Sequence, residues 1–112
     1  IDSRKTLSGA SPNFVHSLDA AALTMTVHEC LKDGILDYAM VHDSYGTHSP
    51  NMPRLNQRLR EAFVVMYQEH DVLLNLYEDA VVSLPEGTLV PAPPSKGDLD
   101  LTQVLQSDYF FA

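Results

Sequence analysis

Residues 35–47 read Ile-Leu-Asp-Tyr-Ala-Met-Val-His-Asp-Ser-Tyr-Gly-Thr and separate two helical parts of the chain. Apolar, β-branched and aromatic side chains favour extended backbone on both sides of the polar triplet His42-Asp43-Ser44. Gly46 follows the triplet closely, which is typical of a tight reversal. The stretch therefore predicts two short strands joined by a turn at or beside Asp43 and Ser44.

A long helix is predicted before this hairpin. Ser11 is a suitable N-cap and Pro12 suits the first helical position, so the helix should run from Pro12 to about Lys32, after an exposed lead-in over residues 1–9. Its apolar residues fall on two faces, which predicts a helix held between layers of a larger body. One face carries Phe14, Leu18, Ala21 and Met25, and the other carries Leu23, Val27 and Cys30 beside His16 and Asp19.

More helices are predicted after the hairpin. A loop over residues 49–53 leads into a helix whose buried stripe is Leu55, Leu59, Ala62, Phe63 and Met66, and His70-Asp71 separates it from a further helical run ending near Leu84. A proline-rich connector over residues 85–97 then precedes a short helix over residues 99–105 and an aromatic tail, Tyr109 to Ala112. The predicted fold class is α+β, mainly helical with a small antiparallel β-hairpin, and the predicted divisions are residues 1–84, 85–97 and 98–112.

Composition restricts the kinds of protein that this chain can be. The chain has 112 residues and a net charge of −8, most of it in the second half, so clustered positive charge for gripping nucleic acid would have to come from elsewhere. No stretch is long and apolar enough to span a membrane, and no secretion signal is visible. The single cysteine, Cys30, fits a reducing setting, and a first residue other than Met suggests a cut or truncated product.

His42-Asp43-Ser44 is the strongest candidate for chemistry. A carboxylate at the tip of a hairpin emerges from rigid strands into open space, where it can bind a hard cation such as Mg²⁺. Two-metal phosphoryl transfer needs at least a second acidic group, and no other acid of this sequence has an equally convincing setting. On spacing alone, the favoured interpretation of Asp43 is a turn residue that bonds its own backbone.

Other polar residues have plainer interpretations. His28, His48 and His70 lack metal-ligand spacing with each other or with Cys30, so no zinc site is expected. The arginines of the second helix fit a solvated face more readily than a phosphate site, and two acids near the last helix fit its N-cap. These residues are Arg54, Arg58, Arg60, Asp98 and Asp100.

Three ordered segments resemble the single-subunit DNA-dependent RNA polymerases of phages and mitochondria. They are Pro12-Asn13-Phe14-Val15-His16-Ser17 with Asp19, Val41 to Thr47, and the ending from Gly97 to Ala112. The resemblance covers nearly the whole chain and implies part of a right-hand-shaped polymerase palm. It also implies template-directed transfer of a nucleotidyl group from an NTP to an RNA 3′-hydroxyl.

The resemblance implies a role for three residues and for the tail. Asp43 corresponds to the second of two catalytic aspartates, a Mg²⁺ ligand, and His42 to a histidine lining the active site. His16 corresponds to a residue facing the minor groove of the RNA–DNA hybrid, and the aromatic end of the chain lies beside the active site in that family. The first catalytic aspartate and the fingers helix have no counterpart in these residues.

The implied partners are a DNA template, nascent RNA, NTPs and the preceding part of the polymerase, with no membrane. The implied location is the host cytoplasm of a phage, in preference to the mitochondrial matrix or another organelle. Two other functions remain open from the residues alone. One is a metal phosphohydrolase with His42-Asp43 on a helix, and the other is a non-enzymatic acidic helical binding module.

Overall fold

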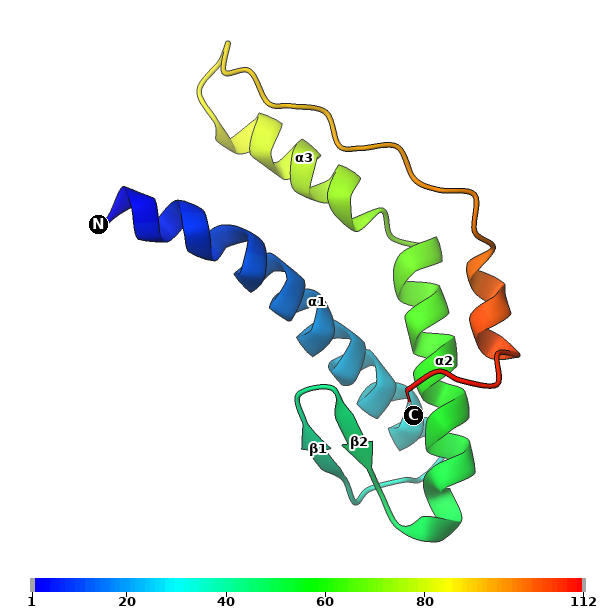
Figure 1. Cartoon of the computed structure of the whole chain (residues 1–112). Coiled ribbons are helices and arrows are strands. Elements are labelled where there is room, and N and C mark those ends of the chain that lie inside the picture. Colours follow the sequence, from blue (N-terminus) through cyan, green and yellow to red (C-terminus); the bar gives the residue numbers. More distant parts are fainter. Residues whose placement is uncertain (1, 112) are drawn as a thin grey trace. The chain divides into compact units, whose positions relative to one another are not determined.

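The computed structural model describes residues 2–111 and is mainly helical with one two-stranded antiparallel sheet (Figure 1). The predicted α+β class is therefore confirmed. Two compact units divide the chain, one up to Phe63 and the other from Val64 onward. The elements are α1 (Ser3–Lys32), β1 (Ala39–Val41), β2 (Ser44–Gly46), η1 (Ser49–Asn51), α2 (Met52–Gln68), α3 (Val72–Ser83) and η2 (Leu101–Leu105).

Helix α1 begins nine residues earlier than predicted, so the expected start at Pro12 is wrong. Asp2, not Ser11, is the N-cap, and its carboxylate accepts hydrogen bonds from the backbone amides of Arg4 and Lys5. Pro12 lies inside the helix, where it removes only the bond that its missing N–H would have donated to the Ser8 carbonyl. A Ser-Pro pair is favourable at a helix start, but an earlier cap lets the helix continue through it.

The first unit has a small core where the end of α1 meets the hairpin and the start of α2. Cys30, Ile35 and Leu55 are buried there, and the partly buried side chains of Tyr38, Met40 and Tyr45 pack against them. Thr26 is also fully buried, and its hydroxyl donates to the Ala22 carbonyl one turn earlier. The most buried face of α1 is therefore the one with Cys30, while Phe14, Leu18 and Met25 on the other stripe are half-buried.

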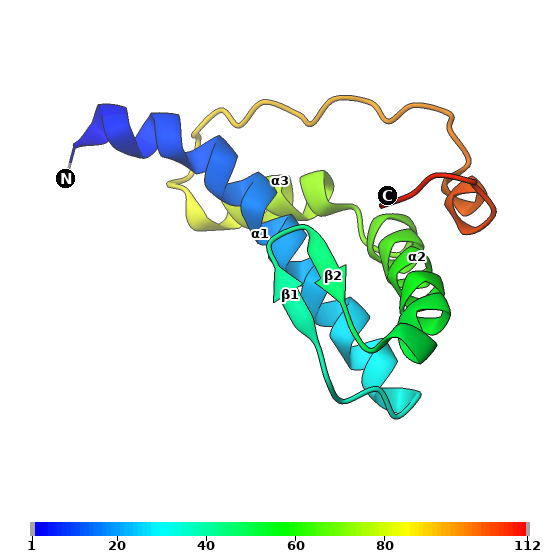
Figure 2. The same cartoon turned by 60° about the horizontal axis from the view of Figure 1, so that its bottom comes forward.

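The hairpin has the predicted position, although β1 begins only at Ala39 and Ser44 lies in β2 rather than in the turn. β1 and β2 pair in the register Ala39 with Gly46, Met40 with Tyr45 and Val41 with Ser44, which leaves His42 and Asp43 as the two turn residues. Figure 2 shows the hairpin lying along the C-terminal half of α1. Gly46 is required by its surroundings, because a Cβ atom there would lie 3.1 Å from the Ala39 carbonyl oxygen.

The second unit contains α3, the proline-rich segment, η2 and the tail. Asp71 caps α3 by accepting from the Leu74 amide at 3.1 Å, which confirms the predicted break at His70-Asp71. The same carboxylate pairs with the Lys96 ammonium at 3.0 Å, so the end of the connector is tied to the start of α3. The connector itself forms no helix or strand between Leu84 and Asp100.

The last predicted helix is a 3₁₀-helix, Leu101–Leu105, rather than an α-helix. Asp100 is its N-cap, and its carboxylate accepts hydrogen bonds from both the amide and the hydroxyl of Thr102. Such a local Asx-type bond favours the tight turn of a short 3₁₀-helix. Asp98 has no such role. In the tail, the Phe110 and Phe111 rings meet edge to face with centroids 5.1 Å apart, and Ala112 lies outside the described residues.

Within residues 2–111, no helix has both the length and the apolar character needed to cross a membrane.

Candidate active site

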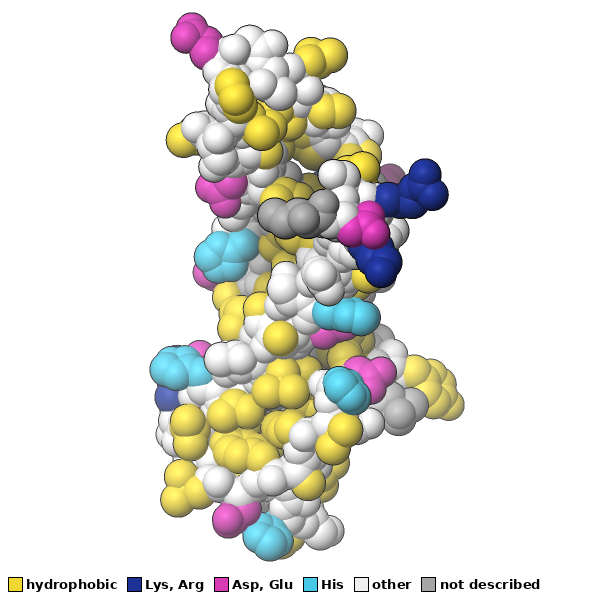
Figure 3. All heavy atoms as spheres, turned by 90° about the vertical axis from the view of Figure 1, so that its left-hand side faces the viewer, with side chains coloured by type: hydrophobic (Ala, Val, Ile, Leu, Met, Phe, Trp, Pro, Cys, Tyr) yellow, Lys and Arg dark blue, Asp and Glu magenta, His cyan; other side chains and the backbone are white. Residues whose placement is uncertain are grey.

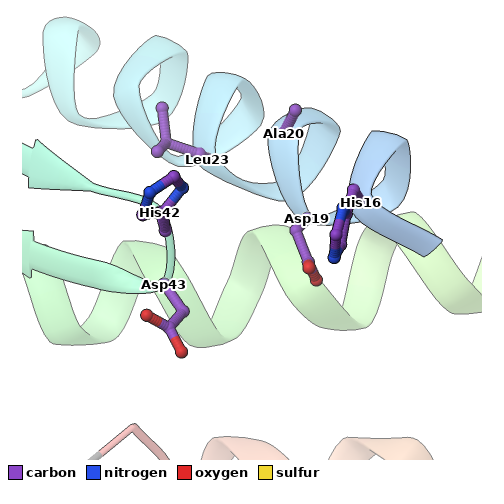
Figure 4. Close-up of a pocket in the computed structure, with 6 residues that line it drawn as sticks. All are labelled: His16, Asp19, Ala20, Leu23, His42 and Asp43. Carbon is purple, nitrogen blue, oxygen red and sulfur yellow. The ribbon is translucent and has the colours of Figure 1, made fainter. Parts of the chain in front are cut away.

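Helix α1 and the hairpin turn enclose a hollow of about 610 Å³ in the first unit (Figure 4). Helix α1 contributes the wall, and the turn between β1 and β2 contributes His42 and Asp43. The lining residues are His16, Asp19, Ala20, Leu23, His42 and Asp43. The structure thus brings together all three of the residues singled out in the sequence, His16, His42 and Asp43.

The side chains of this hollow have distinct directions. Figure 4 shows the His42 ring turned toward Leu23 on α1, whereas Asp43 projects away from the helix into open space. The Asp19 carboxylate extends from α1 toward the same side as Asp43, with the His16 ring beside it. Two carboxylates and two imidazoles therefore share one open hollow.

The spacing along α1 explains why these residues share a face. His16, Asp19, Leu23, Thr26 and Cys30 follow one another at intervals of three and four residues, which keeps them on one side of a helix. This face is polar where it meets the hairpin tip and fully buried at Thr26 and Cys30 near the hairpin base. Packing at the buried end therefore holds the polar end against the turn.

The backbone of the turn is unusual at His42, where φ is 53°. A two-residue hairpin loop with positive φ at its first central residue has the character of a type II′ turn, in which glycine is usual. Histidine occurs in this region more often than most side chains do, although it remains uncommon there. The turn therefore places an imidazole where a glycine would be easier to accommodate.

The phenol of Tyr45, on β2 behind the turn, is kept neutral by its surroundings. Burial raises the pKa of Tyr45, and the negative charges of Asp19 and Asp43 raise it further. The negative charge available to a cation comes from Asp19 and Asp43.

Sequence reasoning missed Asp19 as a part of the site. It was recognised as part of the first segment that resembles the polymerases and as a neighbour of His16 on the helix side that carries Leu23, but it was given no role. The signal that could have identified it is the three-residue interval from His16, which puts both side chains on the same turn of the helix face. Among residues 2–111, no three His, Cys, Asp or Glu side chains are grouped closely enough to hold a metal ion.

Comparison with known proteins gives the class to which this site belongs. The sequence pattern of the DNA-dependent RNA polymerase family matches residues 1–92. The chain is 43% identical over 117 residues to the DNA-directed RNA polymerase of Enterobacteria phage T3, and equally so to T7 RNA polymerase of Escherichia phage T7. It is 46% identical over 100 residues, 89% of its length, to DNA-directed RNA polymerase 1A of Nicotiana tabacum.

The chain belongs to the phage-type DNA-dependent RNA polymerase family. It is matched over its full length by the two phage enzymes but spans only 13% of the length of each. It spans 63% of the length of the tobacco polymerase 1A. The chain therefore corresponds to a small part of the phage enzymes.

The two other functions considered from the sequence fit less well. A His-Asp phosphohydrolase requires His42 and Asp43 on a helix, and the structure puts both in a hairpin turn. An independent binding module should leave no large apolar surface open. Figure 3 shows hydrophobic side chains open on one face between histidine and acidic side chains, and Leu36 and Val41 near the hairpin are 72% and 64% exposed.

Proposed function

We propose that this chain is the part of a DNA-directed RNA polymerase that supplies Asp43 as a Mg²⁺ ligand for nucleotidyl transfer. The intact enzyme would transfer a nucleotidyl group from an NTP to the 3′-hydroxyl of nascent RNA, under the direction of a DNA template. The observation that carries the proposal is the convergence of Asp43, His42, His16 and Asp19 on one hollow in a chain of this family.

The donor set suits magnesium. Asp43 and Asp19 offer hard carboxylate oxygens toward the same side of the hollow, and both residues are exposed. Magnesium keeps several waters and uses one or two carboxylates together with substrate phosphates, so a site built from few protein ligands is its usual form. Asp43 would hold the metal, and further ligands would come from the preceding part of the polymerase, which the family resemblance implies.

When bound, the metal pair would stabilise the attacking 3′-oxygen and the leaving oxygen of pyrophosphate at the α-phosphate of the NTP. The residues of this chain would orient the reactants. His42, turned toward Leu23, would shape the floor beside the RNA 3′ end and limit the space open to water. His16, at the outer end of the same α1 face, would meet the minor groove of the RNA–DNA hybrid. Most of the rate would then come from positioning and charge neutralisation.

The relatives leave two settings for the intact enzyme. A phage enzyme would act in the cytoplasm of an infected host, whereas the plant relatives are named as mitochondrial or chloroplastic. Of these settings, we favour the host cytoplasm, with the DNA template, nascent RNA, NTPs and the rest of the polymerase as partners.

The decisive test is Asp43→Asn in the intact polymerase. This substitution keeps the shape of the side chain but removes its charge, so nucleotide incorporation should fall about 10³-fold or more, the scale of losing a preorganised electrostatic group. Promoter binding, measured by fluorescence anisotropy, should stay close to normal.

A matched control is Asp37→Asn, at the base of the same hairpin. The Asp37 carboxylate is 78% exposed and lies 3.6 Å from the His48 ring, so its loss should change incorporation less than about twofold. Incorporation at the wild-type rate by the Asp43→Asn enzyme would end the proposal.

A further inference from the structure

One carboxylate at the end of α1 accepts four hydrogen bonds from two arginines of α2. Arg54 donates from Nε to Asp33 Oδ2 at 2.7 Å and from Nη2 to Asp33 Oδ1 at 2.9 Å. Arg58 donates from Nε to Asp33 Oδ2 at 2.6 Å and from Nη2 to Asp33 Oδ1 at 3.0 Å. Both contacts are bidentate, the strongest and most directional form of this pairing. We name the three residues the Asp33 clamp.

Each clamp arginine also donates a third hydrogen bond, from its Nη1. Arg54 Nη1 donates to Gln57 Oε1 at 2.8 Å, and Arg58 Nη1 donates to Glu61 Oε2 at 2.7 Å. Gln57 in turn donates to Glu61 at 2.8 Å, so two positive and two negative charges form one neutral network. Three hydrogen bonds thus hold each guanidinium within the chain.

The clamp is partly withdrawn from solvent. The Asp33 side chain is 17% exposed and that of Arg58 is 22% exposed, while Arg54 is more open at 42%. Hydrogen bonds from the two arginines hold the pKa of Asp33 far below its usual range, so the carboxylate stays charged. Partial burial and ideal bidentate geometry distinguish this network from an ordinary exposed surface pair.

The clamp closes the base of the segment that carries Asp43. Asp33 directly follows α1, and Arg54 and Arg58 lie on the first two turns of α2, so the hairpin lies entirely between them. A second closure lies further in, where the Thr47 hydroxyl donates to the Asp37 carbonyl at 2.7 Å. The strand pairs from Ala39–Gly46 to Val41–Ser44 follow, and the turn comes last. The segment is thus closed in three successive places: by the Asp33 clamp at its base, by the Thr47–Asp37 hydrogen bond further in, and by the strand pairs next to the turn.

We propose that Asp33, Arg54 and Arg58 are positioning residues that set the location of Asp43 through the hairpin. This inference rests on the function proposed above. Each strand has only three residues, and an isolated two-stranded hairpin is marginally stable in water. The position of the tip therefore depends on how firmly the two ends of the segment are held, and the clamp holds both ends to one point.

The test uses Asp33→Asn and Arg58→Gln in the intact polymerase. The magnesium concentration for half-maximal incorporation should rise about 10-fold, the usual effect of removing a group that orients a metal ligand. Amide hydrogen exchange of residues 39–46, measured without metal, should become faster. The matched control is Arg60→Gln on the same helix, because Arg60 donates to Asn56 at 2.9 Å and does not contact Asp33. The control should leave both readouts unchanged.

The magnesium requirement separates positioning from general destabilisation. A smaller folded fraction lowers the amplitude of incorporation but leaves the half-saturating magnesium concentration where it was. Asp33→Glu, which keeps the charge, should restore part of the wild-type value. If Asp33→Asn does not fold, Arg54→Gln provides the same measurement, because it leaves the Arg58 contact in place.

The inference would be overturned if the clamp variants kept both the wild-type magnesium dependence and the wild-type rate of amide hydrogen exchange in the hairpin. This holds whatever the result for Asp43→Asn. An active Asp43→Asn enzyme would instead overturn the proposed function, whatever the clamp variants do.

Discussion

The two units of the chain differ in how much of their geometry they fix by themselves. The first unit has a buried core around Cys30, Ile35 and Leu55, a paired hairpin and the Asp33 clamp. In the second unit, only Val64 and Met66 are buried among the described hydrophobic residues, and α3 has no buried residue. The first carries six basic and seven acidic side chains, and the second carries one and eight.

This difference separates two kinds of contribution to a larger enzyme. The residues that we assign to chemistry all lie in the unit that holds its own turn in place. The second unit offers acidic and apolar surface, with Leu76, Val82 and Tyr109 at 47%, 85% and 85% exposure. Large apolar groups left in water forgo stabilisation of about 1.5–3 kcal/mol each, so this surface is expected to be covered in the intact polymerase.

The largest effect should come from isolating the chain. Alone, it should synthesise no RNA, and it should bind Mg²⁺ with a dissociation constant of about millimolar or weaker, because so few carboxylates displace little of the tightly held water. Titration calorimetry measures the affinity, and the Asp43→Asn chain is the reference for non-specific binding. Micromolar binding would contradict the expectation that the rest of the enzyme supplies the other metal ligands.

The next effect concerns the aromatic tail of the second unit. Tyr109 is 85% and Phe111 45% exposed, so both rings have further apolar surface to bury in the intact enzyme. In the intact polymerase, deleting Phe111 and Ala112 should lower the elongation rate about 10-fold or more, in line with the cost of misplacing groups near the reacting atoms. The melting temperature of the same enzyme should change little. Full elongation after the deletion would show that the tail is a surface appendage.

The smallest effect compares one glycine from each unit. Gly46→Ala would place a Cβ atom 3.1 Å from a backbone oxygen of β1, which cannot move without parting the strands. We expect a loss of about 1–3 kcal/mol in the stability of the hairpin against local opening, the usual cost of overpacking. Hydrogen exchange of β1 and β2 amides measures it.

Gly97→Ala in the second unit is the control, because no atom lies within 4 Å of a Cβ built at Gly97. Equal exchange rates in the two variants would mean that the strands adjust to the added methyl group without cost.

Local signals in the sequence predicted the hairpin and the break between α2 and α3 correctly. Alternation, turn residues and Gly46 act over a few residues, so their outcome depends little on the rest of the fold. The start of α1 was mispredicted because Ser11-Pro12 is as favourable locally as Asp2, and the choice depends on whether a helix is already formed upstream. The last helix was predicted over residues 99–105 without a helix type, because a run of five residues carries too little periodicity to distinguish a 3₁₀-helix from an α-helix.

The site was predicted in part. His42 and Asp43 stand out because a polar pair interrupts extended backbone, and the structure places both in the turn. The Asp33 clamp could not be predicted, because Asp33 and Arg58 are 25 residues apart and only the fold brings them together. The spacing from His16 could have pointed to Asp19, but whether Asp19 joins the site depends on which side of α1 the hairpin covers.

The continuous helix α1 also determines which insertions and deletions the chain can tolerate. Asp19 and Cys30 differ by eleven positions, and at 100° per residue they point within about 20° of each other. Removing one residue between them would turn the His16 end by about 100° relative to the buried end, and the wall of the hollow would face elsewhere. The interval from Asp19 to Cys30 should therefore accept substitution far more readily than any change in its length.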